Sequence, residues 1–231
     1  MIKIVIVSNS IKFDKGVFNI FAESHKIVAS NIYDNVLNIY GLKLDKEKLL
    51  WGSIAPDFLP QYKLIRHYQD ESINYISKEI VKIIFISRYL EFNKILDPLA
   101  INLLSKKIGV ISHYLSDYVC LPHARRWTFS DSMMKHIKYE SALNNYAINH
   151  TFKKNVITVD NIGIFDDEST SLKVKIKEFI EKVVEEYSLK TSLKHDLDFA
   201  LSLNLKITYF ILDSIKVYSE DMHKVFALEI L

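Results

Sequence analysis

A short stretch in the middle of the chain gathers side chains of the types that bind zinc. It carries a His-x3-Asp pair, a single histidine and a His-x3-Glu pair, formed by His113, Asp117, His123, His136 and Glu140. Residues four apart share one face of a helix, so each pair can chelate one ion. His123 directly follows Pro122, where one helix should end and a turn begin. Imidazole nitrogen and carboxylate oxygen both suit zinc. One such pair alone is more typical of a solvated helix face, but two pairs with a histidine between them indicate a metal site.

Three further candidate ligands precede this stretch. His25 falls in the first long helix that the sequence predicts, where an isolated histidine is ordinarily a polar or packed residue. Asp57 follows Pro56, which should place it at a helix end or in a loop, and His67 lies in a loop-like segment. A carboxylate and an imidazole on such a connection can turn towards a common ion. A turn aspartate and a surface histidine would fit Asp57 and His67 equally well.

The elements that must position these residues are predicted to be helices. The chain of 231 residues holds only 5 glycines and 4 prolines, well below the average usage of about 7% and 5%. Helical periodicity and capping residues predict helices over residues 17–40, 71–93, 98–119, 132–150, 172–187 and 195–218. A further helix is predicted to begin at 45–50 and to end at Pro56. Residues 2–7 are compatible with a strand or an extended arm, and a short strand is compatible with 156–170. The predicted fold class is therefore all-α, in one domain over residues 1–231.

Three of these helices carry specific expectations about burial. The helix over 98–119 places His113 and Asp117 beside apolar residues, where burial is costly unless the two are paired or bound to metal. The helix over 172–187 shows one apolar stripe, made of Leu172, Ile176, Phe179, Ile180, Val183 and Tyr187. The helix over 195–218 is apolar nearly all round. Polar residues interrupt it, so we expect a central buried helix and not a membrane span.

Composition narrows the class of protein further. A formal charge of +2 is too small to indicate a nucleic-acid partner. The single cysteine, Cys120, excludes an internal disulfide and is expected to be a packed small residue. His150 is expected at the surface. The N-terminal sequence lacks the apolar region of a secretory signal, so the protein is expected in the cytoplasm, or outside the cell if a leader was removed.

In their order along the chain, the eight candidate ligands resemble those of the zinc-dependent phospholipase C family. These are all-α bacterial enzymes that bind three zinc ions in a cleft. The resemblance covers about His25 to Glu140, roughly half the chain. It rests on the joint order of the ligands, on the APD triplet that contains Asp57, and on the sequences SHYLSDYVCLPH and HIKYE.

The resemblance implies a ligand set for each ion. One zinc would be held by Asp57, His67, His113 and Asp117. A second would be held by His123, His136 and Glu140, with one position open to substrate or water. Asp117 would also bridge to a third ion that His25 ligates. In the family an N-terminal tryptophan completes this third site, but residue 1 here is Met and no tryptophan precedes Trp51. Two zinc ions are therefore expected, and the third stays open.

The chemistry expected of these ligands is hydrolysis of a phosphodiester. Two metal ions about 3.5–4 Å apart can lower the pKa of a shared water and clamp a phosphoryl group. The water would attack phosphorus in line with the leaving alkoxide, and Asp57 could orient it or accept its proton. The resemblance implies a phospholipid substrate at a membrane surface, cleaved to diacylglycerol and a phosphorylated head group. No nucleic-acid partner is expected.

Head-group preference depends on aromatic residues near the cleft, because a quaternary ammonium binds ring faces. Phe58 matches one such aromatic and is the candidate substrate-binding residue. Leu64 stands where a second would be expected, which makes choline preference doubtful, and Tyr62 or Tyr68 could replace it.

Two alternatives to a phospholipase C stay open. The related single-strand-specific zinc nucleases share the fold and most ligands. Their last two histidines lie further apart and their last ligand is Asp, so the spacing from His123 to His136 and the identity of Glu140 favour the phospholipase. The other alternative is a non-catalytic member in which metal only stabilises the helices.

Overall fold

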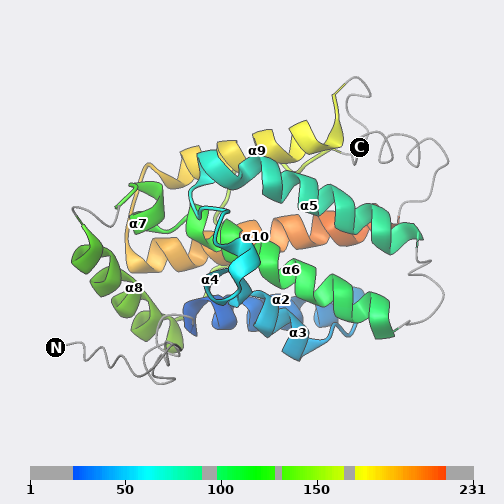
Figure 1. Cartoon of the computed structure of the whole chain (residues 1–231), viewed down its shortest axis with the longest axis horizontal. Coiled ribbons are helices and arrows are strands. Elements are labelled where there is room, and N and C mark those ends of the chain that lie inside the picture. The colour runs from blue at the N-terminus through cyan, green and yellow to red at the C-terminus, as the bar shows by residue number, and fades with distance from the viewer. Residues whose placement is uncertain (1–22, 90–97, 128–131, 164–169, 217–231) are drawn as a thin grey trace.

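A computed structural model describes residues 23–89, 98–127, 132–163 and 170–216, and its regular structure there is entirely helical (Figure 1). The helices are α2 (Glu23–Tyr40), α3 (Lys46–Gly52), α4 (Ala55–Phe58), the 3-10 turn η1 (Pro60–Tyr62), α5 (Gln69–Tyr89), α6 (Pro98–Tyr118), α7 (Leu121–Ala124), α8 (Met133–Ile148), α9 (Leu172–Tyr187) and α10 (Leu193–Lys216). The all-α prediction is confirmed. The strand or arm expected at 2–7 and the expected helix start at residue 17 lie outside the described residues.

The core surrounds α10, which contacts α2, α5, α6, α8 and α9 (Figure 1). Seventeen of the 24 residues of α10 are buried, including every residue from Asp196 to Leu205, as its largely apolar sequence predicts. In the described ranges, no helix is both long enough and apolar enough to cross a bilayer. The interpretation of this segment as a central buried helix is therefore confirmed.

Helix α9 covers the core with the face that its sequence predicts. All six apolar residues of its stripe, from Leu172 to Tyr187, are buried. Ser171 caps the helix, because its hydroxyl accepts a hydrogen bond from the backbone N–H of Val174. The short strand expected in 156–170 does not form over residues 156–163, and 164–169 lie outside the described residues.

The prolines begin short helices where the sequence predicted that helices end. Helix α3 stops at Gly52, and Pro56 lies in the first turn of α4, which carries Asp57. Pro122 likewise lies in the first turn of α7, so His123 belongs to a short helix and not to a turn. Proline fits a first turn because its missing N–H would have no intrahelical partner there.

A close crossing of α3 and α6 sets the position of the following backbone. A Cβ added to Gly52 would lie 2.3 Å from the carbonyl oxygen of Lys106, and one added to Gly109 would lie 2.3 Å from that of Leu49. Only glycine at both positions lets the two helix backbones touch. The contact carries Ser53, which directly follows Gly52, against the middle of α6.

Candidate metal centre

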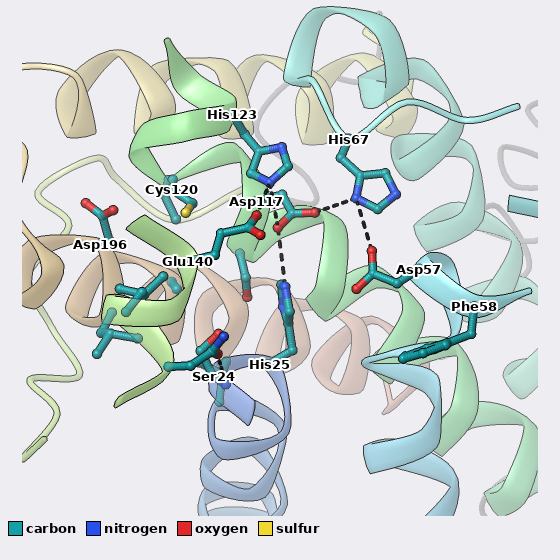
Figure 2. A pocket seen from close by; sticks show the side chains of 17 residues that line it. Ser24, His25, Asp57, Phe58, His67, Asp117, Cys120, His123, Glu140 and Asp196 are labelled. Atoms are coloured by element: carbon teal, nitrogen blue, oxygen red, sulfur yellow. Dashed lines mark hydrogen bonds and ion pairs between the residues drawn. The ribbon is translucent and has the colours of Figure 1, made fainter. Parts of the chain in front are cut away.

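The eight candidate ligands converge from six separate segments onto one region of the molecule. Helix α2 supplies His25, α4 supplies Asp57, α6 supplies His113 and Asp117, and α7 supplies His123. Helix α8 supplies His136 and Glu140, and the connection before α5 supplies His67. Most of these side chains line a cavity of about 220 Å³. Figure 2 shows their polar ends turned towards one another.

Asp117 lies at the centre of the group. Its Oδ2 is 2.8 Å from His67 Nδ1 and 3.2 Å from His113 Nε2. Its Oδ1 faces the other way, 3.4 Å from His25 Nε2 and 3.6 Å from His123 Nε2. A single buried carboxylate therefore faces four imidazoles, which is the arrangement expected of a bridging ligand.

A first cluster consists of Asp57, His67, His113 and Asp117. Ligand atoms of His67, His113 and Asp117 all lie within 4.8 Å of one another. Asp57 Oδ1 is 3.5 Å from His113 Nε2 and 3.8 Å from His67 Nδ1, so it is the most loosely placed of the four. Its side chain is 39% exposed, whereas that of Asp117 is buried. Asp57 is therefore the carboxylate of this cluster that a molecule in the pocket can reach.

A second cluster consists of His123, His136 and Glu140, whose ligand atoms again lie within 4.8 Å of one another. Glu140 Oε1 is 2.7 Å from His136 Nε2 and 3.2 Å from His123 Nε2. His136 and Glu140 are one turn apart on α8, as their spacing predicts. Short helix α7 brings His123 to them.

His25 lies beside the first cluster. Its ring stacks on that of His113 with 4.2 Å between ring centroids, and its ligand atom groups with those of Asp57 and His113. Asn144, one turn beyond Glu140 on α8, accepts a hydrogen bond of 2.7 Å from the backbone N–H of Ser24. This bond ties the start of α2, and with it His25, to the helix that carries the second cluster.

The mutual contacts of these groups shift their pKa values strongly. Burial raises the pKa of Glu140, but hydrogen bonds from His123 and His136 outweigh it and bring that pKa to about 2. Burial also raises the pKa of Asp117, yet the imidazoles that face it, His123 first among them, hold it well below its usual value. The pKa of Asp57 is lowered in the same way, chiefly by His113, which outweighs the effect of burial. The carboxylates therefore remain ionised and able to bind a cation.

The imidazoles respond in the opposite sense. Burial lowers the pKa values of His25, His67 and His136, but the neighbouring carboxylates outweigh it and raise all three above the ordinary value. The site therefore favours positive charge between these side chains. A bound metal ion would supply that charge in place of the protons.

The orientation of the rings fits zinc. Backbone carbonyls accept hydrogen bonds from Nδ1 of His113 and of His136, at 2.8 Å from Ser53 O and 3.1 Å from Trp127 O. Each Nδ1 therefore carries a proton, and Nε2, which faces the carboxylates, can bind a metal ion once its own proton has left. Backbone carbonyls orient zinc-binding histidines in this way.

One buried atom reinforces this fit. His25 Nδ1 has no hydrogen-bond partner among the described residues. Buried polar atoms without partners are rare and costly, and an unplaced ion is one of their ordinary explanations. The donor atoms present therefore match the nitrogen and oxygen ligands that zinc takes.

The aromatic candidates for head-group binding lie in different surroundings. Phe58 lines the pocket beside Asp57 (Figure 2). Tyr62 is buried in the core, and Leu64 is 93% exposed. The ring of Tyr68 lies 6.1 Å from that of His123, but the guanidinium of Arg126 already covers it at 4.8 Å. Phe58 is therefore the one member of this candidate set with access to the pocket.

Sequence reasoning was wrong about His150 and did not find several supporting groups. His150 is not a surface residue: its side chain is 5% exposed and its Nε2 lies 2.7 Å from Asp198 Oδ1. Its aromatic contacts with Tyr146 and Phe152 explain the burial. The carbonyl partners of the histidines carry no sequence signal, since every residue has a carbonyl. Asn144 does carry one, because it lies one turn beyond Glu140 on the same helix face.

A comparison with protein families agrees with this geometry. A family model described as zinc dependent phospholipase C matches residues 24–191, which contain all eight candidate ligands. No curated protein and no solved structure matches the sequence. The family match extends beyond the stretch from His25 to Glu140 and includes α9. The chain belongs to the zinc-dependent phospholipase C family.

Proposed function

We propose that this protein hydrolyses phosphodiesters with zinc, and that it cleaves glycerophospholipids to diacylglycerol and a phosphorylated head group. The observation that carries the proposal is the convergence of five imidazoles and three carboxylates, six of which line one pocket, in a chain of this family. The first cluster would hold one zinc ion and the second cluster another. His25 and Asp117 would contribute to a third.

Asp57 and Asp117 differ in exposure, and we therefore assign them different roles. Zinc bound at these clusters would supply Lewis acidity to the phosphoryl oxygens and lower the pKa of a water. Asp57 can accept a proton from a water in the pocket, because its carboxylate is partly exposed and, with a pKa below the usual value, is ionised. Asp117 is enclosed by imidazoles and is suited to binding metal ions as a bridging ligand.

The lining of the pocket favours an anionic substrate whose charge is balanced by metal. Its described residues include no lysine or arginine. Arg66 is exposed and pairs with Glu71 at 3.5 Å, on the surface beside His67. A phosphodiester in this pocket would therefore depend on zinc for charge neutralisation, which is how metal-dependent phosphodiesterases operate.

The surroundings of Phe58 support a broad head-group preference. A cation–π contact with one ring contributes about 0.5–1 kcal/mol at an exposed site. Because Tyr62 is buried and Arg126 covers Tyr68, Phe58 would act without a second ring. Phosphatidylcholine and phosphatidylethanolamine should therefore be cleaved at rates within about fivefold of each other, since 1.36 kcal/mol corresponds to a factor of ten.

The loop between Phe58 and His67 supports a substrate presented in a lipid surface. Both ends of this loop line the pocket, and Leu64 lies between them. Leu64 is the most exposed of the large apolar side chains in the described ranges. Transfer of such a side chain from water into lipid is favourable by about 1.5–3 kcal/mol. The loop can therefore insert into a membrane while the pocket faces the head groups.

The proposal is tested with the full chain, loaded with zinc, on three substrates. These are phospholipid vesicles, a soluble chromogenic phosphorylcholine ester and single-stranded DNA. We expect release of diacylglycerol from vesicles, loss of that activity after chelation, and its return with zinc. Turnover of DNA alone would instead assign the protein to the nuclease side of the family. Bound zinc without turnover of any substrate would favour a structural role for the metal.

A further inference from the structure

A buried carboxylate outside the ligand set joins the two helices that carry the second cluster. Asp196 lies in the first turn of α10, is 1% exposed, and lines the pocket. Figure 2 shows it beyond Cys120, on the side of the pocket away from Asp57 and His67. The function proposed above gives it no role, and a buried carboxylate is costly unless its hydrogen bonds compensate for burial.

Asp196 accepts hydrogen bonds from three different helices. Its Oδ2 accepts from the backbone N–H of Leu121 at 3.0 Å and from the Tyr139 hydroxyl at 2.8 Å. Its Oδ1 accepts from the Tyr187 hydroxyl at 2.8 Å. One side chain of α10 therefore holds α7, α8 and α9.

The bond to Leu121 fixes the start of α7. The residue at the N-cap position is Cys120, which makes no side-chain capping bond. The first N–H groups of a helix lack intrahelical partners, and Asp196 supplies an acceptor for that of Leu121. His123 follows two residues later in the same four-residue helix, so its position depends on this anchor.

The bond to Tyr139 acts on the other two ligands of the second cluster. Tyr139 directly precedes Glu140 on α8. Its ring packs edge-on against Trp127 with 5.7 Å between centroids, and the carbonyl of Trp127 accepts the hydrogen bond from His136 Nδ1. The same carboxylate therefore supports all three ligands of the second cluster from behind, whereas none of these three hydrogen bonds reaches the first cluster.

We propose that Asp196 is a positioning residue for the second cluster. It holds His123 and Glu140 in register for one zinc ion without touching zinc or substrate. The inference rests on the proposed function only in taking this cluster as a zinc site. Groups that orient metal ligands from behind typically contribute about 10- to 100-fold to metal affinity.

The test measures the affinity of the full chain for zinc by competition with a chromophoric chelator. Asp196→Ala should weaken the binding of zinc at the second cluster by about 10- to 100-fold. The zinc affinity of the first cluster should not change. Asp196→Asn should retain most of the zinc affinity of the wild-type protein. Its amide oxygen can take the place of Oδ2, and its NH2 group can donate to the Tyr187 hydroxyl, which also accepts.

Asp198 provides a matched control on the same helix. It is 4% exposed and accepts from His150 Nε2 at 2.7 Å and from the backbone N–H of Lys153 at 2.9 Å, but neither partner lies on a ligand-bearing helix. Asp198→Ala should lower stability and leave both zinc affinities unchanged. If the two alanine variants weaken zinc binding equally, Asp196 has only a general structural role and the proposal is overturned.

A milder variant covers the case in which Asp196→Ala does not fold. Tyr139→Phe removes one hydroxyl and should weaken zinc binding at the second cluster by a smaller factor. Unchanged zinc affinities in this variant would overturn the proposal. The same measurements distinguish a failure of this proposal from a failure of the proposed function. Wild-type protein that binds no zinc would overturn both proposals, whereas loss of site selectivity in the Asp196 variants overturns this one alone.

Discussion

Gly52 and Gly109 lie in direct backbone contact where α3 crosses α6. This contact carries the carbonyl of Ser53 to within 2.8 Å of His113 Nδ1, so a helix crossing in the core orients a ring of the first cluster. The chemistry of the site therefore depends on two residues that have no side chain.

Replacing Gly109 by Ala should destabilise the fold and disturb the first cluster together. The new Cβ would lie 2.3 Å from a backbone carbonyl oxygen, which cannot move aside as a side chain can. Overpacking of this kind costs about 1–3 kcal/mol. Urea unfolding of the chelator-treated protein measures this cost, and zinc titration measures the weaker binding that we expect.

Gly41→Ala is the control for this substitution. Gly41 ends α2 with φ +63° and has nothing within 4 Å of an added Cβ. The substitution should lower the free energy of unfolding by about 1–2 kcal/mol, the strain of a left-handed residue. It should leave zinc affinity unchanged. Equal effects of the two substitutions on zinc would show that the α3–α6 crossing does not position His113.

The sequence predicted the ligands because their chemistry and helical spacing are local properties. Two His-x3-carboxylate pairs remain one turn apart whatever surrounds them, and the apolar stripe of α9 is likewise a property of one segment. Backbone carbonyl partners, the contact between Gly52 and Gly109 and the burial of His150 are different. They depend on which helices meet, and a single helix carries no information about its neighbours.

The short helices α4 and α7 illustrate the same limit. Proline marks the end of one helix and fits the first turn of the next equally well. Pro56 and Pro122 predicted breaks, and breaks are found near both. Only the packed structure decides that Asp57 and His123 then lie in new helices.

Asp57→Asn should separate catalysis from metal binding. His67, His113 and Asp117 still offer three ligands, and Asp57 lies further from the imidazole nitrogens than Asp117 does. We expect zinc content to be retained and turnover to fall by about 10²- to 10⁴-fold, the usual contribution of a general base. Asp117→Asn, by contrast, should release zinc. If both variants release zinc alike, Asp57 acts mainly as a ligand.

Leu64→Ser should reduce activity on vesicles and leave activity on the soluble ester unchanged. Loss of an inserted leucine should weaken vesicle binding roughly tenfold. Vesicle sedimentation measures this binding directly. Leu99→Ser is the control, since Leu99 is 75% exposed but lies about 27 Å along α6 from Asp117, at 1.5 Å per residue. Equal vesicle binding by both variants would exclude insertion of the loop between Phe58 and His67.

Glu79 links α5 to α6 and should make stability depend on acidic pH. It is 6% exposed and pairs with Lys82 and Lys107. Burial raises its pKa, but hydrogen bonds from the two lysines outweigh this and lower it below 4.5. A carboxyl with a lowered folded-state pKa stabilises the fold above its unfolded-state pKa, and this contribution is lost as pH falls through the folded value.

Glu79→Gln tests this linkage in chelator-treated protein. At pH 7 the free energy of unfolding of the variant should be lower by about 1.5–3 kcal/mol, the usual range for hydrogen bonds to a charged group. The difference from wild type should shrink as the pH falls below about 4.5, because protonated Glu79 resembles Gln. A difference that stays constant from pH 7 to pH 3 would contradict the lowered pKa.

Anomalous diffraction at the zinc edge, from crystals grown with zinc, tests the central claim most directly. We expect one peak among His67, His113 and Asp117 and a second among His123, His136 and Glu140, with the second absent from His136→Ala crystals. Crystals with a full zinc supply and no peak at either cluster would contradict the assignment of this site as a zinc centre.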